Sequence, residues 1–112
     1  MSKKYLTKNE FRLDLNPNHF GKNTKPHPTY ISARRNHMYR ANSITHARFT
    51  TDGKKTFDIL ENPNKLSSDK RNVRVSPPYW QNDKQFSNYK LTNYRFSNKT
   101  RKKIKKINKK YK

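Results

Sequence analysis

The feature that most constrains the fold is a region of alternating polar and apolar residues, broken by turns, between positions 27 and 64. Its segments TYISA (29–33) and MYRANSITHARFT (38–50) are rich in the β-branched and aromatic residues that favour strands. Asp52-Gly53 separates the second segment from TFDIL (56–60), and an Asp-Gly pair in such a place is typical of a β-hairpin. The region therefore predicts an antiparallel sheet in which 56–60 returns from 38–50.

Shorter strands are expected on both sides of this region. FRLDLN (11–16) predicts an edge strand with its phenylalanine and leucines on one face. NVRVS (72–76) predicts a strand with both valines inward, and YKLTNYRF (89–96) predicts a last strand. The prolines of PPYW lack the N–H that a sheet interior requires, so this segment is excluded from a central strand. A bulge at 42–43 is an open alternative to a regular strand there.

The end of the chain has a different pattern. Ser97 is a suitable N-cap, and Ile104, Ile107 and Tyr111 are spaced to share one face of a helix. From Lys99 onward the chain has nine basic residues and no acidic one. The pattern predicts a basic helix that packs a narrow apolar stripe against the rest of the protein.

These elements predict a mainly β, small α+β fold: a curled antiparallel sheet of four to six strands, an SH3-like half-barrel, with a basic C-terminal helix. Only 29% of the 112 residues are hydrophobic, so the core must be small and rich in aromatic side chains. The chain is expected to divide into an extended N-terminal arm (1–26), a small β domain (27–96) and a basic C-terminal helix or tail (97–112).

The net charge of +21, from 28 basic and 7 acidic residues, indicates a polyanionic partner. We expect nucleic acid, with RNA favoured over DNA; an anionic membrane surface and an acidic protein are other possible partners. The basic tail alone does not account for the charge, so the β domain is basic as well. Closely spaced lysines neutralise phosphates and release counterions, which gives affinity without sequence choice.

Several kinds of chemistry are excluded or disfavoured. There is no cysteine, which excludes disulfides, thiolate catalysis and cysteine-ligated zinc. The four histidines lack the spacing of metal ligands on a helix, so we expect neither a metal nor a cofactor. No segment approaches the length of a membrane span, and the first residues lack the apolar region of a secretory signal, so a cytoplasmic protein is expected.

The candidate nucleic-acid contacts are arginines of the sheet, whose forks match phosphate, and lysines of the tail. They are Arg34, Arg35, Arg40, Arg48, Arg71, Arg74, Lys102, Lys103, Lys105 and Lys106. Tyr30, Tyr39, Phe49 and Trp80 lie among the arginines and could form a platform for bases. Packing in the core is the favoured alternative for most of these aromatics, because the chain has few other large apolar residues.

A catalytic alternative rests on Thr45, His46 and Arg48, with His27 and Arg34 nearby in the expected hairpin. RNA cleavage through the 2′-hydroxyl needs a general base, a general acid and a cation to stabilise the developing charge, and these residue types supply them. If the protein is an enzyme, a metal-independent endoribonuclease is expected. The alternative is that these are ordinary polar residues at a strand end, and the non-enzymatic interpretation is favoured.

The pattern HPTYISARR…YRANSITHARFT…FDILENPN…VRVSPPYW resembles small basic proteins encoded on mobile elements and phages of low-GC Gram-positive bacteria. More distantly, the strand order is similar to PemK/Kid-type endoribonuclease toxins with an SH3-like barrel. That second resemblance places Thr45 of NSITHAR at an active cleft and implies an antitoxin partner, although the proline that precedes this motif in the toxins is absent. The hypotheses are therefore a nucleic-acid-binding protein of mobile-element or phage type, an endoribonuclease toxin, and a ribosome-associated structural protein.

Overall fold

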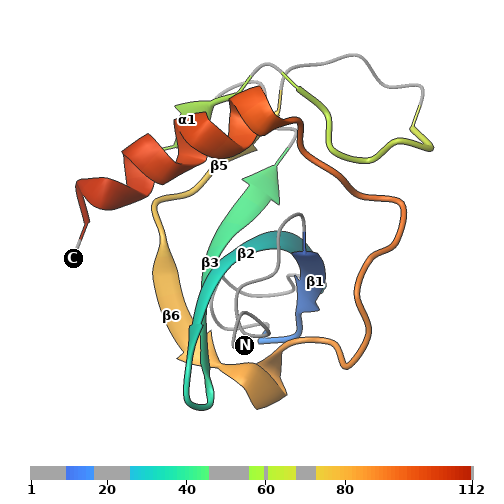
Figure 1. Cartoon of the computed structure of the whole chain (residues 1–112). Coiled ribbons are helices and arrows are strands. Elements are labelled where there is room, and N and C mark those ends of the chain that lie inside the picture. Colours follow the sequence, from blue (N-terminus) through green and yellow to red (C-terminus); the bar gives the residue numbers. More distant parts are fainter. Residues whose placement is uncertain (1–9, 17–25, 46–55, 60, 68–72, 112) are drawn as a thin grey trace, which may run out of the picture.

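The computed structural model describes residues 10–16, 26–45, 56–59, 61–67 and 73–111. An antiparallel sheet curls through this part of the chain, and one C-terminal helix crosses the sheet near the end of its third strand (Figure 1). The elements are β1 (Glu10–Asp14), β2 (His27–Arg35), β3 (Met38–Thr45), β4 (Phe57–Asp58), β5 (Arg74–Val75), β6 (Tyr79–Asn82), the 3₁₀ turn η3 (Asp83–Gln85) and α1 (Asn98–Lys109). The sheet has six strands and is not closed, which confirms the predicted mainly β fold with a basic C-terminal helix.

The hairpin of β2 and β3 forms the middle of the sheet. Its turn places Asn36 at a φ of 54°, a left-handed conformation that asparagine tolerates better than most residues. The strand register is regular through Asn42 and Ser43, so the bulge considered there is absent. The irregularity lies in β2 instead, between Ile31 and Ala33. It occurs where Tyr30 packs into one hydrophobic cluster and Ile31 into another.

The second edge of β3 pairs with two strands in succession. β5 pairs with the end of β3 and β6 pairs with its beginning, so the chain from 74 to 82 follows one edge. Ser76 joins the two strands next to the prolines: its N–H donates to the Ser43 carbonyl at 3.0 Å, and its hydroxyl accepts from the Ser43 N–H at 2.9 Å. A side-chain hydroxyl thus continues the hydrogen bonding where the prolines interrupt the ladder.

The expected pairing of 56–60 with 38–50 is wrong for the described residues. β4 pairs with β5, and β5 lies between β4 and β3. The Asp52-Gly53 turn lies outside the described residues. The inward valines are confirmed, because Val73 and Val75 are both fully buried. β5, which comes later in the chain, therefore pairs with β3 at the position where the local sequence predicted residues 56–60.

Strand β1 buries a carboxylate where an apolar residue was expected. Phe11 is fully buried as predicted, but Leu15 is 43% exposed and Asp14 is only 1% exposed. The Asp14 carboxylate accepts hydrogen bonds from the Tyr79 hydroxyl (2.7 Å), the Gln81 amide (2.8 Å) and the Asn16 N–H (2.9 Å). Burial, then the hydrogen bond to Asp14 and its charge, raise the pKa of Tyr79. This polar cluster joins β1 to β6.

Residues 89–96 do not form the predicted strand. After η3 the chain follows the outer edge of β1 and makes separate main-chain bonds to it, including Leu91 N–H to the Phe11 carbonyl at 2.7 Å. Tyr94 makes an isolated bridge to Asn64. The alternating pattern there reflects burial against the core, where Phe96 is 1% exposed and its ring packs edge-on against Phe11 and Tyr30.

Candidate nucleic-acid interface

Helix α1 begins and packs as its sequence predicts. Ser97 is the N-cap, and its hydroxyl accepts from the Thr100 N–H at 3.3 Å. Ile104 and Ile107 are buried in the larger hydrophobic cluster, and Tyr111 packs against the same cluster. The sequence did not indicate the role of Asn108, whose amide exchanges hydrogen bonds of 2.9 and 3.2 Å with the buried amide of Asn42 on β3. This reciprocal pair fixes the rotation of the helix relative to the sheet.

Glu61 holds the beginning of α1. Its carboxylate accepts from the Ser97 hydroxyl at 2.9 Å, from the Ser97 N–H and from the Thr100 hydroxyl, and it pairs with Lys65 at 3.0 Å. A carboxylate here also complements the positive end of the helix dipole. Burial alone would raise the pKa of Glu61, but the hydrogen bonds from Thr100, Lys65 and Ser97 outweigh it and hold the pKa below its ordinary value.

Because the pKa of Glu61 is lowered in the folded protein, its contribution to stability is complete above the ordinary pKa. That contribution is lost as the pH falls through the lowered value. We expect Glu61→Ala to reduce the free energy of unfolding by about 1–2 kcal/mol at neutral pH. Urea unfolding at a series of pH values measures this difference, which should shrink under acid conditions. A difference that stays constant down to strongly acidic pH would contradict the role of the charge.

Arg40 holds the other end of α1. Its guanidinium donates to the carbonyls of Asn108 (3.2 Å) and Tyr111 (2.6 Å), which lie in and just after the last turn. It also lies over the ring of Trp80, 6.0 Å from the centroid. From its sequence, Arg40 is a candidate for nucleic-acid contact, whereas in the structure it is a cation that closes the C-terminal end of the helix.

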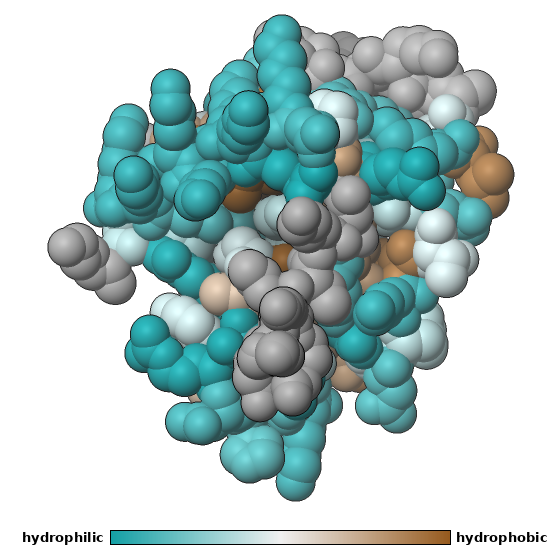
Figure 2. All heavy atoms as spheres, in the orientation of Figure 1, coloured by the Kyte–Doolittle hydropathy of each residue, from teal (hydrophilic) through white to brown (hydrophobic). Residues whose placement is uncertain are grey.

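The basic side chains of α1 fall on two sides of its buried face. One side, which we call the groove flank, carries Arg101, Lys102, Lys105 and Lys109. The other side, which we call the outer flank, carries Lys99, Lys103 and Lys106 and is continued by the C-cap residue Lys110, all exposed. This separation follows from 3.6 residues per turn once Ile104 and Ile107 are fixed inward. Hydrophilic side chains accordingly gather over α1 at the upper left of Figure 2.

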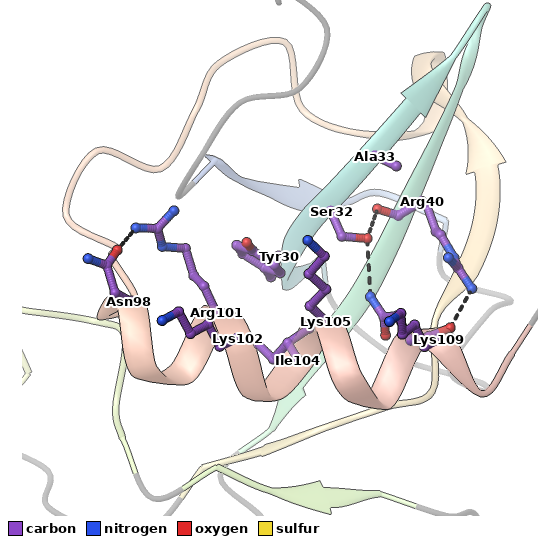
Figure 3. A pocket seen from close by; sticks show the side chains of 11 residues that line it. Tyr30, Ser32, Ala33, Arg40, Asn98, Arg101, Lys102, Ile104, Lys105 and Lys109 are labelled. Carbon is purple, nitrogen blue, oxygen red and sulfur yellow. Dashed lines mark hydrogen bonds between the residues drawn. The ribbon is translucent and has the colours of Figure 1, made fainter.

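A cavity of about 650 Å³ lies between the groove flank and strands β2 and β3. We call it the groove. Figure 3 shows Arg101 and Lys105 rising from α1 toward Tyr30 and Ser32 of β2. The described residues that line it include five cations and no acidic residue. The lining is Tyr30, Ser32, Ala33, Arg40, Asn98, Arg101, Lys102, Ile104, Lys105, Asn108 and Lys109.

Two of the groove arginines have an unsatisfied donor. Within the described ranges, the buried side-chain nitrogens without a hydrogen-bond partner are the Nε atoms of Arg40 and Arg101. Each such donor costs about 1–3 kcal/mol. Burial raises the pKa of Tyr30, and the positive charge of Arg101 opposes that rise. The groove therefore concentrates positive charge that the described lining leaves uncompensated.

The structure distributes the other predicted cations in different ways. Arg34 and Arg35 are exposed near the β2–β3 turn, where they lie over the rings of Tyr39 (5.4 Å) and Trp80 (5.1 Å). Arg74 binds within the sheet, donating to the hydroxyl and carbonyl of Thr56 and lying 3.8 Å from Asp58. The predicted contacts do not include Arg101 and Lys109 of the groove lining, although both lie one helical turn from Lys105, and that spacing would have identified them.

The predicted catalytic set is not brought together within the described residues. Thr45 ends β3 opposite Arg74 of β5, while His46, Arg48 and Arg71 lie outside the described residues. His27 begins β2, opposite Asp14. No group of three or more metal-binding side chains occurs in the part of the chain that the structure describes.

Most of the described aromatic residues proposed as a platform for bases pack in the core, which was the favoured alternative. Tyr30 and Tyr39 are 7% and 8% exposed, and Phe49 lies outside the described residues. Trp80 is exposed enough to touch solvent, at 36%, and two arginines already lie over it. An exposed stacking surface of several rings is therefore not present in the described part of the sheet.

Together, the fold and the groove define a small antiparallel β protein whose C-terminal helix forms a cationic cavity with the sheet. Comparison with known proteins adds no relative: no family model, no curated protein and no solved structure matches this chain. No helix among the described residues is long and apolar enough to cross a membrane.

Proposed function

We propose that this protein binds nucleic acid by holding phosphates in the groove, as a small basic protein of the mobile-element or phage type. The observation that carries the proposal is the groove itself, which gathers five cations and no acidic residue along its described lining. Cations held close together repel one another, and a bound polyanion relieves this repulsion. Binding also releases counterions from the polyanion, which favours the complex.

The attachment of α1 supports this proposal. The helix is held against the rest of the protein by its buried isoleucines, the Asn42–Asn108 pair, Glu61 and Arg40. The backbone of the groove flank is therefore fixed before a ligand binds. From Arg101 to Lys109 the flank extends for about 12 Å of helix. Because the helix backbone is already fixed, binding loses less conformational entropy than it would for a flexible basic tail. We favour RNA over DNA because RNA offers single-stranded loops and ends as accessible targets.

The test exploits the two flanks of α1. The variant Lys102→Gln/Lys105→Gln/Lys109→Gln removes three charges beside the groove, and Lys99→Gln/Lys103→Gln/Lys106→Gln removes three from the outer flank. Fluorescence anisotropy with a labelled single-stranded RNA across a salt series should show the groove variant binding about tenfold or more weaker than the outer variant. Its dependence of log K on log salt should also flatten by about two units, since each lost phosphate contact on a single strand removes about 0.7.

Equal losses in the two variants would contradict the groove as the binding site and leave only diffuse attraction to a basic helix. The same samples, examined on a denaturing gel, test the enzymatic alternative. Discrete cleavage of the RNA that disappears in His46→Ala would overturn the binding function and favour an endoribonuclease with an antitoxin as partner. We expect intact RNA at every salt concentration.

A further inference from the structure

We infer that the groove seats one nucleotide of a single strand, with the phosphate on the groove flank and the base over an apolar floor, and that it accepts different bases. The inference rests on the proposed function and names the class of nucleic acid that the groove takes. It follows from three properties of the groove: its size, the position of its apolar residues, and the internal use of its neutral donors.

The size and floor of the groove suit a nucleotide better than a bare phosphate. A cavity of about 650 Å³ is within the range of about 300–1,000 Å³ that is usual for small-molecule sites. Ile104 is 1% exposed and Tyr30 is 7% exposed, so the apolar surface in the lining comes from Ala33 and the edge of the Tyr30 ring. Four of the five cations stand on the helix, and Arg40 stands on β3 (Figure 3). An anion alone would leave this apolar surface in water, whereas an attached base would cover it.

The same arrangement disfavours a duplex. In a double helix the bases are stacked and paired inside the phosphate backbone, so only phosphates could reach the cations at the rim. Placing a base in the groove would require unstacking it, which costs free energy in a duplex and much less in a single strand. Single strands are therefore the ligands that use both the charge and the floor.

The groove offers few neutral donors for reading the edges of bases. The Ser32 hydroxyl donates to the Arg40 carbonyl at 3.3 Å. Both amide hydrogens of Asn108 are used within the protein, one by Asn42 and one by the Ser32 oxygen. The lining also contains two other neutral donors, the Asn98 amide and the Tyr30 hydroxyl, while its remaining donors are charged and prefer phosphate. We therefore expect weak discrimination among bases.

Competition against the wild-type protein tests this inference. A labelled single-stranded RNA is displaced with AMP, with ribose 5-phosphate or with inorganic phosphate, in each case at constant ionic strength. AMP and ribose 5-phosphate carry the same phosphate, so the base is the difference between them. We expect AMP to displace the RNA at about a tenfold lower concentration, the range that covering one base provides. UMP and GMP should fall within a few-fold of AMP, and the same RNA annealed to its complement should bind about tenfold more weakly.

A variant that fills the floor supplies a second readout. Ala33→Phe places a larger side chain in the groove and so fills part of it without changing its charge. This variant should abolish the advantage of AMP over ribose 5-phosphate. Thr92→Phe, at an exposed turn residue outside the groove, is the matched control and should keep that advantage. Circular dichroism spectra verify that both variants fold. The competition experiment with the wild-type protein does not depend on either variant.

The outcomes separate this inference from the proposed function. If duplex binds as tightly as single strand and ribose 5-phosphate competes as well as AMP, the nucleotide pocket is overturned while phosphate binding by the groove stands. If no polynucleotide binds at moderate salt, both are overturned.

Discussion

Replacing Asp14 with alanine is expected to lower the free energy of unfolding by about 3 kcal/mol or more. The carboxylate is 1% exposed and accepts from the Tyr79 hydroxyl, the Gln81 amide and the Asn16 N–H. Without it, donors that lie between β1 and β6 lose their acceptor, and each unsatisfied buried donor costs about 1–3 kcal/mol. In a small domain whose total stability is about 5–15 kcal/mol, this loss removes a large part of the margin.

Urea unfolding followed by circular dichroism measures this effect. Asp58→Asn is the matched control, because Asp58 is a half-exposed carboxylate whose 3.8 Å contact with Arg74 is worth about 1 kcal/mol or less. Asp14→Asn is also informative, since it keeps the shape but turns an amide N–H₂ toward other donors, and it should recover little stability. An Asp14→Ala variant as stable as Asp58→Asn would mean that water replaces the carboxylate at low cost, contrary to our account.

Replacing Phe96 with alanine should have a comparable effect through packing, with a loss of about 3–5 kcal/mol. Phe96 is 1% exposed and its ring meets those of Phe11 and Tyr30 at centroid distances of 5.1 and 5.3 Å. It directly precedes Ser97, the N-cap of α1, so it ties the start of the helix to the core. The cavity left behind would loosen both the sheet and one end of the groove.

Thermal unfolding of Phe96→Ala beside Tyr89→Ala tests this role. Tyr89 is 59% exposed, so its truncation removes an aromatic ring of similar size without opening a cavity, and it should change stability by about 0.5 kcal/mol or less. If both variants melt at the same temperature, Phe96 does not anchor the core in the way the structure indicates.

The sequence predicts those elements whose packing is decided by their own pattern. The spacing of Ile104, Ile107 and Tyr111 defines the buried face of α1, and Ser97 marks its start. Val75 of β5 and Val73 just before it are both buried because alternate residues of an extended chain face the same side. In each case the information lies within a few neighbouring residues.

The sequence does not predict the features that depend on distant partners. β5 separates β4 from β3, which no local hairpin signal could reveal. Leu15 is exposed and Asp14 buried because residues of β6, far along the chain, supply the donors for that carboxylate. Residues 89–96 have a strand-like pattern, but their main-chain bonds reach β1 at Leu91 and residues 63–65 at Asn93 and Arg95.

The same limit applies to the site. Composition gives the basic character, but it cannot tell which cations remain available for a ligand. Arg40 and Arg74 are engaged by carbonyls, Thr56 and Asp58 inside the fold. The helix period separates Lys102 and Lys105 from Lys103 and Lys106, but only the position of the sheet shows which pair borders a cavity.

The most direct test of the central claim, that the groove is where nucleic acid binds, is a titration of ¹⁵N-labelled protein with a short single-stranded RNA, followed by amide NMR shifts. We predict the largest amide shifts at Ser32, Ala33, Arg101 and Lys105, which line the groove from both sides. Shifts confined to the outer flank, at Lys99, Lys103 and Lys106, with the β2 amides unchanged, would contradict the account.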